Sequence, residues 1–217
     1  GYIRSVARLA PRDGRILHPF DNRVEADRAR HALDMAAAGR RVLVVSSGDP
    51  GVFAMAAAVY EVLETDPTRW QDVDITVLPG ITAMLAAAAR VGAPLGHDFC
   101  VINLSDNLKP WAMIEQRLRL ALQADFAMAF YNPRSKSRPE GFRKTMQILK
   151  SFGEGNRPVI FARAVSTPDE SIMIVPLAEA QPDMADMQTV VLVGSSQTRT
   201  LSHKGAVLAY TPRSVKG

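Results

Sequence analysis

Apolar and polar positions along the first half of the chain form blocks that predict helices and strands in turn. Apolar residues repeated every three or four positions predict helices over 24–39, 52–65 and 81–91. Short aliphatic runs between them predict strands at 41–45 and 74–78. Such short, wholly aliphatic strands are typical of parallel sheets buried on both faces. The alternation indicates βαβ units and therefore an α/β domain with a mostly parallel sheet.

The sequence Gly-Ala-Pro-Leu-Gly at 92–96 breaks this pattern and marks the predicted end of the first domain. We expect one domain over residues 1–95 and a second over residues 96–217. The second half again combines apolar runs with polar loops, so we expect an α/β domain with a mixed sheet. Its predicted helices span 111–124 and 140–151, and its predicted strands span 99–104, 126–131, 158–165, 171–175 and 189–193.

Two glycine-containing loops follow the predicted strands of the first half and are candidates for a ligand site. The loop at 46–51 has glycines that let backbone amides approach a ligand, and it carries the carboxylate of Asp49. The second loop, Pro79-Gly80, leads through Thr82 into a helix whose free N-terminal amides favour an anion. Ligands of open α/β sheets lie at the carboxyl ends of strands. A plain strand-turn-helix and an N-cap threonine explain the same residues without a ligand.

A basic loop follows the predicted strand at 126–131. It carries Arg134, Lys136 and Arg138 among serines and prolines. Alternating cations suit a polycarboxylate or phosphate ligand. A solvated surface loop has the same composition, so both interpretations stay open.

Three titratable side chains flank the predicted strand at 99–104 and are candidates for proton transfer. His97 and Asp98 precede the strand, and Asp106 follows it. A structural histidine at a domain junction is the alternative. The other histidines lack the sequence spacing of zinc ligands, and the single cysteine, Cys100, lies in an apolar run that favours a core position. We therefore expect no metal site.

Composition narrows the classes of function. The 217 residues, 47% of them hydrophobic, are enough for two domains of about 100 residues each with full cores. A net charge of +4 suits an anionic ligand, but it is weak, and with 6% aromatic residues it does not favour nucleic-acid binding. No apolar run reaches the length of about 18 residues that a membrane span needs, so we expect no membrane partner. One cysteine allows no internal disulfide and fits a reducing, cytoplasmic compartment.

Four segments together resemble the tetrapyrrole (precorrin) methylases. These segments are SSGDPGVF at 46–53, LPGITAM at 78–84, GHDFCVINLSD at 96–106 and FYNPRSKSR at 130–138. The Gly-Asp-Pro loop is shared by all branches of the family, whereas the last two segments narrow the resemblance to the branch that acts on C17 of precorrin-3B. The family normally opens with a short apolar strand and a Gly-Pro-Gly loop. This sequence shows no such segment, so its first domain is expected to lack that strand.

The resemblance implies two α/β domains with the active site in the cleft between them. It also implies S-adenosylmethionine as the methyl donor, with S-adenosylhomocysteine as its product. The implied reaction methylates C17 of precorrin-3B and contracts the ring to give precorrin-4, a step of cobalamin biosynthesis. A homodimer is implied as well. The residues that match the family's donor-binding motifs are Gly48, Asp49, Val52, Phe53, Thr82, Ala83, Tyr131, Asn132, Ala164 and Val165.

A precorrin carries many acetate and propionate carboxylates, which the basic side chains near these motifs could bind through charge-assisted hydrogen bonds. The residues expected to bind the substrate are Arg134, Lys136, Arg138 and Lys109. Ring contraction requires proton transfer, for which the catalytic candidates are His97, Asp98 and Asp106. Three alternatives stay open: another precorrin or cobalt-precorrin methylase, a relative that acts on RNA or on a protein histidine, and a non-enzymatic protein that binds a tetrapyrrole.

Overall fold

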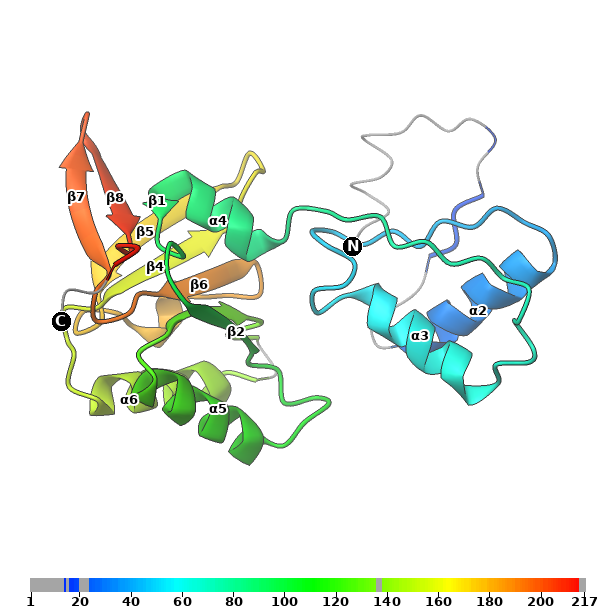
Figure 1. Cartoon of the computed structure of the whole chain (residues 1–217), viewed down its shortest axis with the longest axis horizontal. Helices are drawn as coiled ribbons and strands as arrows, with labels where there is room; N and C mark the ends of the chain where they lie inside the picture. The colour runs from blue at the N-terminus through cyan, green and yellow to red at the C-terminus, as the bar shows by residue number, and fades with distance from the viewer. Residues whose placement is uncertain (1–13, 15, 20–23, 136–137, 215–217) are drawn as a thin grey trace. The chain divides into compact units, whose positions relative to one another are not determined.

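The computed structural model describes residues 14, 16–19, 24–135 and 138–214, and it divides into two units. Unit 1 is Gly1–Thr82 and unit 2 is Ala83–Gly217, and each is described here by itself (Figure 1). This division differs from the boundary predicted at residue 95. Helix α4 (Ala83–Val91) buries Ala87 and Val91 against the sheet of unit 2, and this packing places the helix in the second unit.

Unit 1 contains two helices that pack side by side (Figure 1). They are α2 (Glu25–Ala37) and α3 (Met55–Thr65), and they confirm the helices predicted over 24–39 and 52–65. Leu33 and Val59 lie in the core between them, and Trp70 closes that core from the following loop. The Trp70 indole donates a hydrogen bond of 2.9 Å to Asp34 of α2, which satisfies its buried N–H.

The strands predicted at 41–45 and 74–78 are not formed. Both segments lie within the described part of unit 1, and neither takes part in a strand ladder there. A parallel sheet requires strand partners and cover on both faces, and a pair of strands alone is marginal. The side chains of Leu43 and Leu78 are 73% and 65% exposed, so this cover is lacking. The predicted mostly parallel sheet of the first domain is therefore corrected to two extended segments beside a helix pair.

Unit 2 is built on a five-stranded mixed sheet in the order β2-β3-β6-β4-β5, which confirms the predicted α/β class and mixed sheet. Strands β2 and β3 are parallel, and the remaining neighbours are antiparallel. A 3₁₀ turn, η1 (Pro182–Met184), precedes β6. The strands are β2 (Phe99–Asn103), β3 (Ala127–Tyr131), β4 (Pro158–Arg163), β5 (Ser171–Pro176) and β6 (Thr189–Val193).

Helices cover both faces of this sheet (Figure 1). On β3, Met128 and Phe130 point into the core shared with α5 (Trp111–Gln123) and α6 (Glu140–Ser151). Ala129, between them, points to the opposite face, where it packs in the same cluster as residues of α4. This alternation follows from the two-residue period of a strand. It explains why β3 is almost wholly apolar, since a polar side chain on either face would be buried.

A second, three-stranded sheet was missed by the sequence analysis. Its order is β1-β8-β7, with β1 (Gly92–Ala93) parallel to β8 (Ala206–Tyr210) and β7 (Arg199–His203) antiparallel to β8. The turn between β7 and β8 places Lys204 and Gly205 at φ 48° and 79°. Two positive φ angles define the hairpin turn that matches the twist of the strands.

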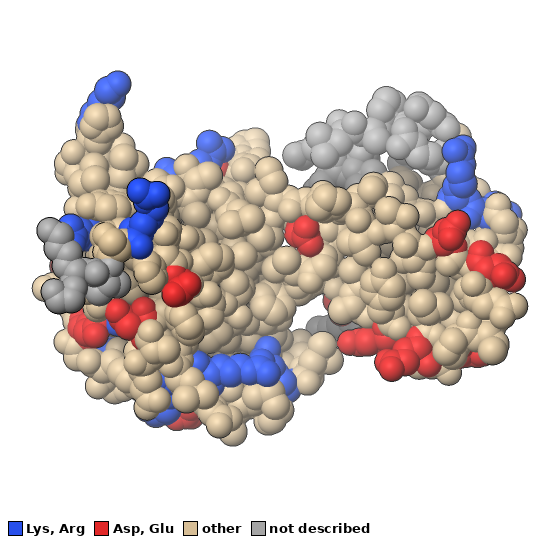
Figure 2. Space-filling model, viewed as in Figure 1, with Lys and Arg blue, Asp and Glu red and all other residues tan. Residues whose placement is uncertain are grey.

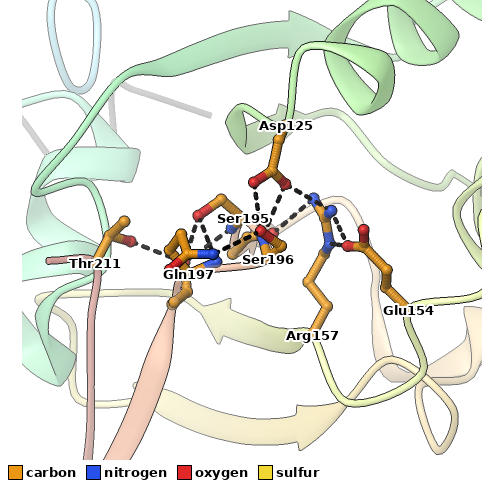
Figure 3. Close-up of polar contacts among 9 residues, drawn as sticks. Asp125, Glu154, Arg157, Ser195, Ser196, Gln197 and Thr211 are labelled. Atoms are coloured by element: carbon orange, nitrogen blue, oxygen red, sulfur yellow. Dashed lines mark hydrogen bonds and ion pairs between the residues drawn. The ribbon is translucent and has the colours of Figure 1, made fainter. Parts of the chain in front are cut away.

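A buried arginine links the loops at the edge of the large sheet where β3 and β4 begin (Figure 3). The Arg157 side chain is 2% exposed. Its guanidinium donates to Asp125 at 2.8 Å, to Glu154 at 2.7 Å and to the Gly194 carbonyl at 3.1 Å. Asp125 also accepts from the amide of Ser196 at 2.8 Å. One cation thus joins the loops before β3, before β4 and after β6.

The same edge is connected to the small sheet through threonine hydroxyls. The Thr198 and Thr211 hydroxyl oxygens lie 2.8 Å apart, and Thr211 donates to the Pro94 carbonyl at 2.5 Å. Thr198 and Thr211 are both buried. Because buried hydroxyls without partners would be costly, this chain of bonds specifies how β7 and β8 attach to the rest of unit 2.

Cys100 lies half-buried on β2, and burial raises the pKa of its thiol to about 11. Only the thiolate reacts with alkylating agents, so at pH 8 about one thiol in a thousand is reactive. We expect iodoacetamide to modify the folded protein roughly a hundred times more slowly than the urea-unfolded protein, as followed by mass spectrometry. Equal rates in the two states would show that the thiol is not shielded.

Across the described residues, no helix combines the length and the apolar character that crossing a membrane requires.

Candidate functional site

Four of the predicted donor-binding residues lie at one edge of the five-stranded sheet of unit 2. Strand β6 is antiparallel to both β3 and β4, so β3 and β4 run in the same direction, as does β2. The ends of these three strands therefore meet at the same edge. Tyr131 ends β3 and is followed by Asn132, while Ala164 and Val165 follow β4. The topology thus brings together these four predicted donor-binding residues.

Helix α4 begins at this edge. The Tyr131 hydroxyl oxygen accepts a hydrogen bond of 2.9 Å from the backbone amide of Met84. Met84 is the second residue of α4, and amides in the first turn of a helix have no partner within it. Ala83, another predicted donor-binding residue, is the first residue of the helix. The side chain of Asn132 donates to that of Asn103, the last residue of β2, at 3.1 Å.

Three of the predicted donor-binding residues other than glycine have left-handed backbone conformations. The φ angles are 53° at Phe53, 51° at Asn132 and 48° at Ala164. Asparagine tolerates this region, whereas phenylalanine and alanine do so at a cost. Backbone strain of this kind concentrates at ligand-binding sites. Asp125, Ser166 and Lys204 share this conformation, so the backbone geometry agrees with a site at these positions but does not single them out.

The two glycine loops of unit 1 are in direct contact. One carboxylate oxygen of Asp49 accepts from the Gly51 amide at 2.8 Å, and the other accepts from the Gly80 amide at 3.0 Å. A Cβ atom on Gly80 would lie 2.1 Å from the carbonyl oxygen of Gly48, so only glycine fits there. The Val52 amide donates to the Asp49 carbonyl at 3.2 Å. The loop at 46–51 and the loop that leads to Thr82 thus form one backbone surface.

These contacts change the acidity of Asp49. The hydrogen bond from Gly80, followed by that from Gly51, holds the pKa of its carboxyl below the usual value, against a smaller opposing effect of burial. Amide donors favour the charged form of a carboxyl group. Asp49 is therefore a carboxylate at neutral pH. Both of its oxygens are engaged by backbone amides of its own unit.

The three proton-transfer candidates do not come together. His97 and Asp98 precede β2, and the ring nitrogen Nδ1 of His97 accepts from the Asp98 amide at 2.8 Å. Asp106 lies beyond the other end of that strand. A strand of five residues separates its two ends by roughly 17 Å. Asp106 thus lies at the edge that gathers Tyr131 and Ala164, whereas His97 and Asp98 lie at the opposite edge.

The basic loop after β3 folds back on itself beside Asp106. Ser135 and Arg138 exchange two backbone hydrogen bonds, and the Arg138 guanidinium lies 3.7 Å from the Asp106 carboxylate. Arg134, in the same loop, is half-buried. Lys136 lies outside the described residues. The structure therefore places Arg134 and Arg138 at the edge where β2 and β3 end.

Lys109 follows Asp106 in the loop after β2. Burial, with a smaller effect from the charge of Arg117, lowers the pKa of its ammonium group. In Figure 2, a strip of basic side chains crosses the surface around α5, whereas acidic side chains gather over the helices of unit 1. This surface of unit 2 suits an anionic ligand.

The sequence analysis missed Asn103 as a site residue. It named Asp106 and Arg138, but it did not predict that they form a pair. Asn103 ends a half-buried apolar strand, FCVIN, and a polar residue in that position was a usable signal.

A surface depression of about 560 Å³ beside α3 is lined by Tyr60, Glu61 and Glu64, among others, and by none of the predicted site residues.

Two histidines that are distant in sequence meet in unit 1. The Nδ1 atom of His18 and the Nε2 atom of His31 lie 3.2 Å apart. The sequence spacing gave no indication of this contact. In the part of the chain that the structure describes, no three histidine, cysteine or acidic side chains gather as metal ligands.

Together, these features define a two-unit α/β protein with a glycine-built loop surface in one unit and a polar sheet edge in the other. Residues 4–181 match the family model of the Tetrapyrrole (Corrin/Porphyrin) Methylases. The chain therefore belongs to the tetrapyrrole methylase family.

Individual relatives agree with this assignment. The chain is 52% identical over 218 residues to a precorrin-3B C(17)-methyltransferase of Sinorhizobium sp., covering 100% of this chain and 86% of the relative. It is 46% identical over 217 residues to the cobalamin biosynthesis protein CobIJ of Mycobacterium tuberculosis, covering 98% of this chain and 42% of that longer protein. The crystal structure of the methyltransferase CobJ superimposes with a TM-score of 0.91 at 62% identity, covering 98% of this chain and 87% of that one.

A more distant structure shares the fold. A uroporphyrin-III C-methyl transferase from Thermus thermophilus, complexed with S-adenyl homocysteine, has a TM-score of 0.58 at 20% identity, covering 80% of this chain and 74% of that one. The predicted two-domain α/β class is confirmed by these relatives, although the strands of unit 1 differ from the prediction as described above.

Proposed function

We propose that this protein methylates C17 of precorrin-3B with S-adenosylmethionine and contracts the ring to give precorrin-4, a step of cobalamin biosynthesis. The observation that carries the proposal is the 52% identity to a precorrin-3B C(17)-methyltransferase over the whole chain. In this chain the candidate site lies mainly on loops held by a regular scaffold, where binding and catalytic residues are concentrated.

The residues of unit 1 fit the methyl donor. S-adenosylmethionine supplies a methyl group already activated by a sulfonium centre. Gly80 packs so closely on Gly48 that a Cβ atom would not fit between the two loops, and a glycine backbone also allows close approach of a ligand. We infer that Gly48, Asp49, Val52 and Phe53 form the donor-binding side of this unit.

The segment after Gly80 and the sheet edge of unit 2 fit the rest of the donor. Thr82 and Ala83 lead into the N-terminus of α4, where amides and the helix dipole favour a carboxylate such as that of the donor's amino-acid group. Tyr131, Asn132, Ala164 and Val165 lie at one edge of the sheet, where ligands of α/β proteins bind. We infer that these residues bind the donor, whose methyl group must be held in line with the acceptor carbon.

The substrate would be held by cations. Arg134, Arg138 and Lys109 are close in the sequence to strand ends at this edge, and guanidinium groups bind carboxylates through paired hydrogen bonds. Lys136 belongs to the same proposal by its place in the loop. Among the three proton-transfer candidates, Asp106 has the position that fits, since it shares the edge with the inferred donor-binding residues.

The proposal is tested by incubating the protein with precorrin-3B and donor labelled in its methyl group. We expect label in a tetrapyrrole product whose mass and absorption spectrum match the ring-contracted, methylated compound. Donor binding without transfer to precorrin-3B would overturn this substrate. Transfer to a cobalt-containing analogue in the same assay would point instead to a cobalt-precorrin methylase.

Calorimetry with the donor alone separates the enzyme from a tetrapyrrole carrier. We expect S-adenosylhomocysteine to bind with micromolar affinity, corresponding to about −8 kcal/mol. A protein that binds tetrapyrrole but shows no heat with S-adenosylhomocysteine would be a carrier.

Replacement of Arg134 by alanine is expected to raise the KM for the tetrapyrrole about tenfold, because one charge-assisted hydrogen bond to a carboxylate is lost. The KM for the donor should stay unchanged. Arg119→Ala is the matched control, since Arg119 pairs with Glu115 on the exposed face of α5. Steady-state kinetics with each substrate varied in turn measure both constants. An equal rise of the KM for the tetrapyrrole in both variants would show that Arg134 does not bind the substrate.

We propose further that the protein acts as a homodimer in the cytoplasm, as the family resemblance and the single cysteine suggest. Light scattering of the purified protein tests the dimer directly, because a mass of twice 23.6 kDa is expected.

A further inference from the structure

Two side chains hold the ends of the short segment that carries Thr82 and Ala83. The first is Asp49, whose carboxylate accepts from the Gly80 amide at 3.0 Å within unit 1. The second is Tyr131, whose hydroxyl accepts from the Met84 amide at 2.9 Å within unit 2. Only residues 81–83 lie between the two anchored amides.

We propose that Asp49 and Tyr131 are positioning residues, which fix this segment at both ends and act on the donor through Thr82 and Ala83 instead of by touching it. The inference rests on the proposed function, because it takes Thr82 and Ala83 to be donor contacts. It refines the proposed function for these two members of the donor-binding surfaces: Asp49 and Tyr131 place the backbone, which is a different task from binding the donor's charge or ring.

The hydrogen bonds of Asp49 support this role. A carboxylate is an acceptor only, and here each oxygen already faces an amide, one of Gly51 and one of Gly80. The carboxylate therefore joins its own loop to the start of the anchored segment. The pKa of Asp49 is lowered by these same amide bonds, so the carboxylate stays charged and keeps both hydrogen bonds at neutral pH.

The place of Tyr131 supports it from the other end. Tyr131 follows Phe130, which is 0% exposed in the centre of the sheet core, so its backbone is held by a rigid strand. Its hydroxyl satisfies one of the free amides that begin α4. A rigid strand thus sets the position of the helix N-terminus, which is the end that favours an anion.

A double-mutant cycle tests the proposal. Asp49→Asn replaces one acceptor oxygen by an NH₂ group that cannot accept, and Tyr131→Phe removes the hydroxyl. We expect each change to weaken S-adenosylhomocysteine binding about tenfold by calorimetry. Because both act through the same three residues, the double variant should bind clearly more tightly than the hundredfold weakening that independent effects predict.

Amide hydrogen exchange distinguishes a local loss of these anchors from a general loss of stability. In the donor-free protein, we expect faster exchange at the anchored amides, Gly80 in Asp49→Asn and Met84 in Tyr131→Phe, while amides of the core strands exchange as before. Matched controls are Asp66→Asn, which removes a similar aspartate-to-amide bond at Arg69, and Tyr60→Phe on the exposed face of α3. Both should bind S-adenosylhomocysteine normally.

The outcomes separate this inference from the proposed function. If the unaltered protein binds S-adenosylhomocysteine and the Asp49 and Tyr131 variants bind it equally well, the positioning role is overturned and the proposed function stands. Weakened binding with unchanged exchange at Gly80 and Met84 would mean direct contact with the donor, which also overturns it. If the unaltered protein binds no S-adenosylhomocysteine, both proposals fail together.

Discussion

Replacement of Arg157 by alanine is expected to lower the free energy of unfolding by about 2–4 kcal/mol. The guanidinium is almost fully buried, and its donors are divided among Asp125, Glu154 and the Gly194 carbonyl. Its removal leaves the Gly194 carbonyl without this donor and leaves a cavity where the side chain packed. Urea unfolding followed by circular dichroism measures the change.

The partly exposed carboxylates decide the size of this effect. Asp125 and Glu154 are 39% and 45% exposed at their side chains, so water solvates both when the arginine is lost. The expected loss therefore lies below the upper end of the range for a wholly buried ion pair. Asp125 keeps its bond from the Ser196 amide, which holds the loops before β3 and after β6 together in part.

Arg143→Ala is the matched control for this variant. Arg143 pairs with Glu140 at the same spacing of three residues, but its side chain is 49% exposed on α6. Exposed pairs of this kind contribute little, so the unfolding midpoint should hardly move. A similar loss of unfolding free energy in both variants would mean that the burial of Arg157 does not matter. Arg157 would then not stabilise this edge of the sheet as we expect.

The pattern of apolar residues was sufficient for most elements of unit 2. Strand β3 and helix α6 begin and end within one residue of their predicted limits, because each apolar run is matched by a neighbour that covers it. The strands predicted at 41–45 and 74–78 failed for the opposite reason. Their aliphatic composition is suited to a parallel sheet, but a sheet depends on partners that a local pattern does not report.

The hairpin of β7 and β8 shows a signal that was present and unused. Residues 199–203 and 206–210 mix polar and apolar side chains, and Lys204-Gly205 lies between them as a two-residue turn. Glycine in the second position allows the positive φ that this turn requires. The mixed composition obscured the strands, since most of their residues are exposed.

The site could be predicted only in pieces. Motif resemblance identified Tyr131 and Ala164, but the sequence did not show that antiparallel β6 lies between β3 and β4 and so directs both ends to one edge. Nor did it show that His97 and Asp106 lie at opposite ends of β2, although they are only nine residues apart. Strand direction, which is a tertiary property, decides which nearby residues share a site.

A single methyl group added at Gly80 is expected to lower kcat/KM for the donor about a hundredfold. In Gly80→Ala, the new Cβ would lie 2.1 Å from the Gly48 carbonyl oxygen and 3.0 Å from its carbon. Both are backbone atoms, so no side-chain rotation relieves the contact. The two loops must separate by about 1 Å to restore van der Waals distances, and displacement on this scale costs about two orders of magnitude in rate when reactants are held in line.

The same separation would lengthen the bond from the Gly80 amide to Asp49, which is 3.0 Å in the unaltered protein. The cores of both units contain no atom of Gly80, so Gly80→Ala should still fold, with a circular dichroism spectrum like that of the unaltered protein. Loss of rate without loss of fold would then locate the effect at the loops.

Gly141→Ala is the control that adds the same methyl group elsewhere. Its Cβ would lie 3.5 Å from the nearest atom, on the Trp111 ring, which is an ordinary contact. Alanine also favours the helix α6 that contains this position, so activity should be retained and stability should rise slightly. Activity of Gly80→Ala within threefold of the unaltered protein would show that the two glycine loops can separate without cost. They would then not form the rigid surface on which donor binding is proposed to depend.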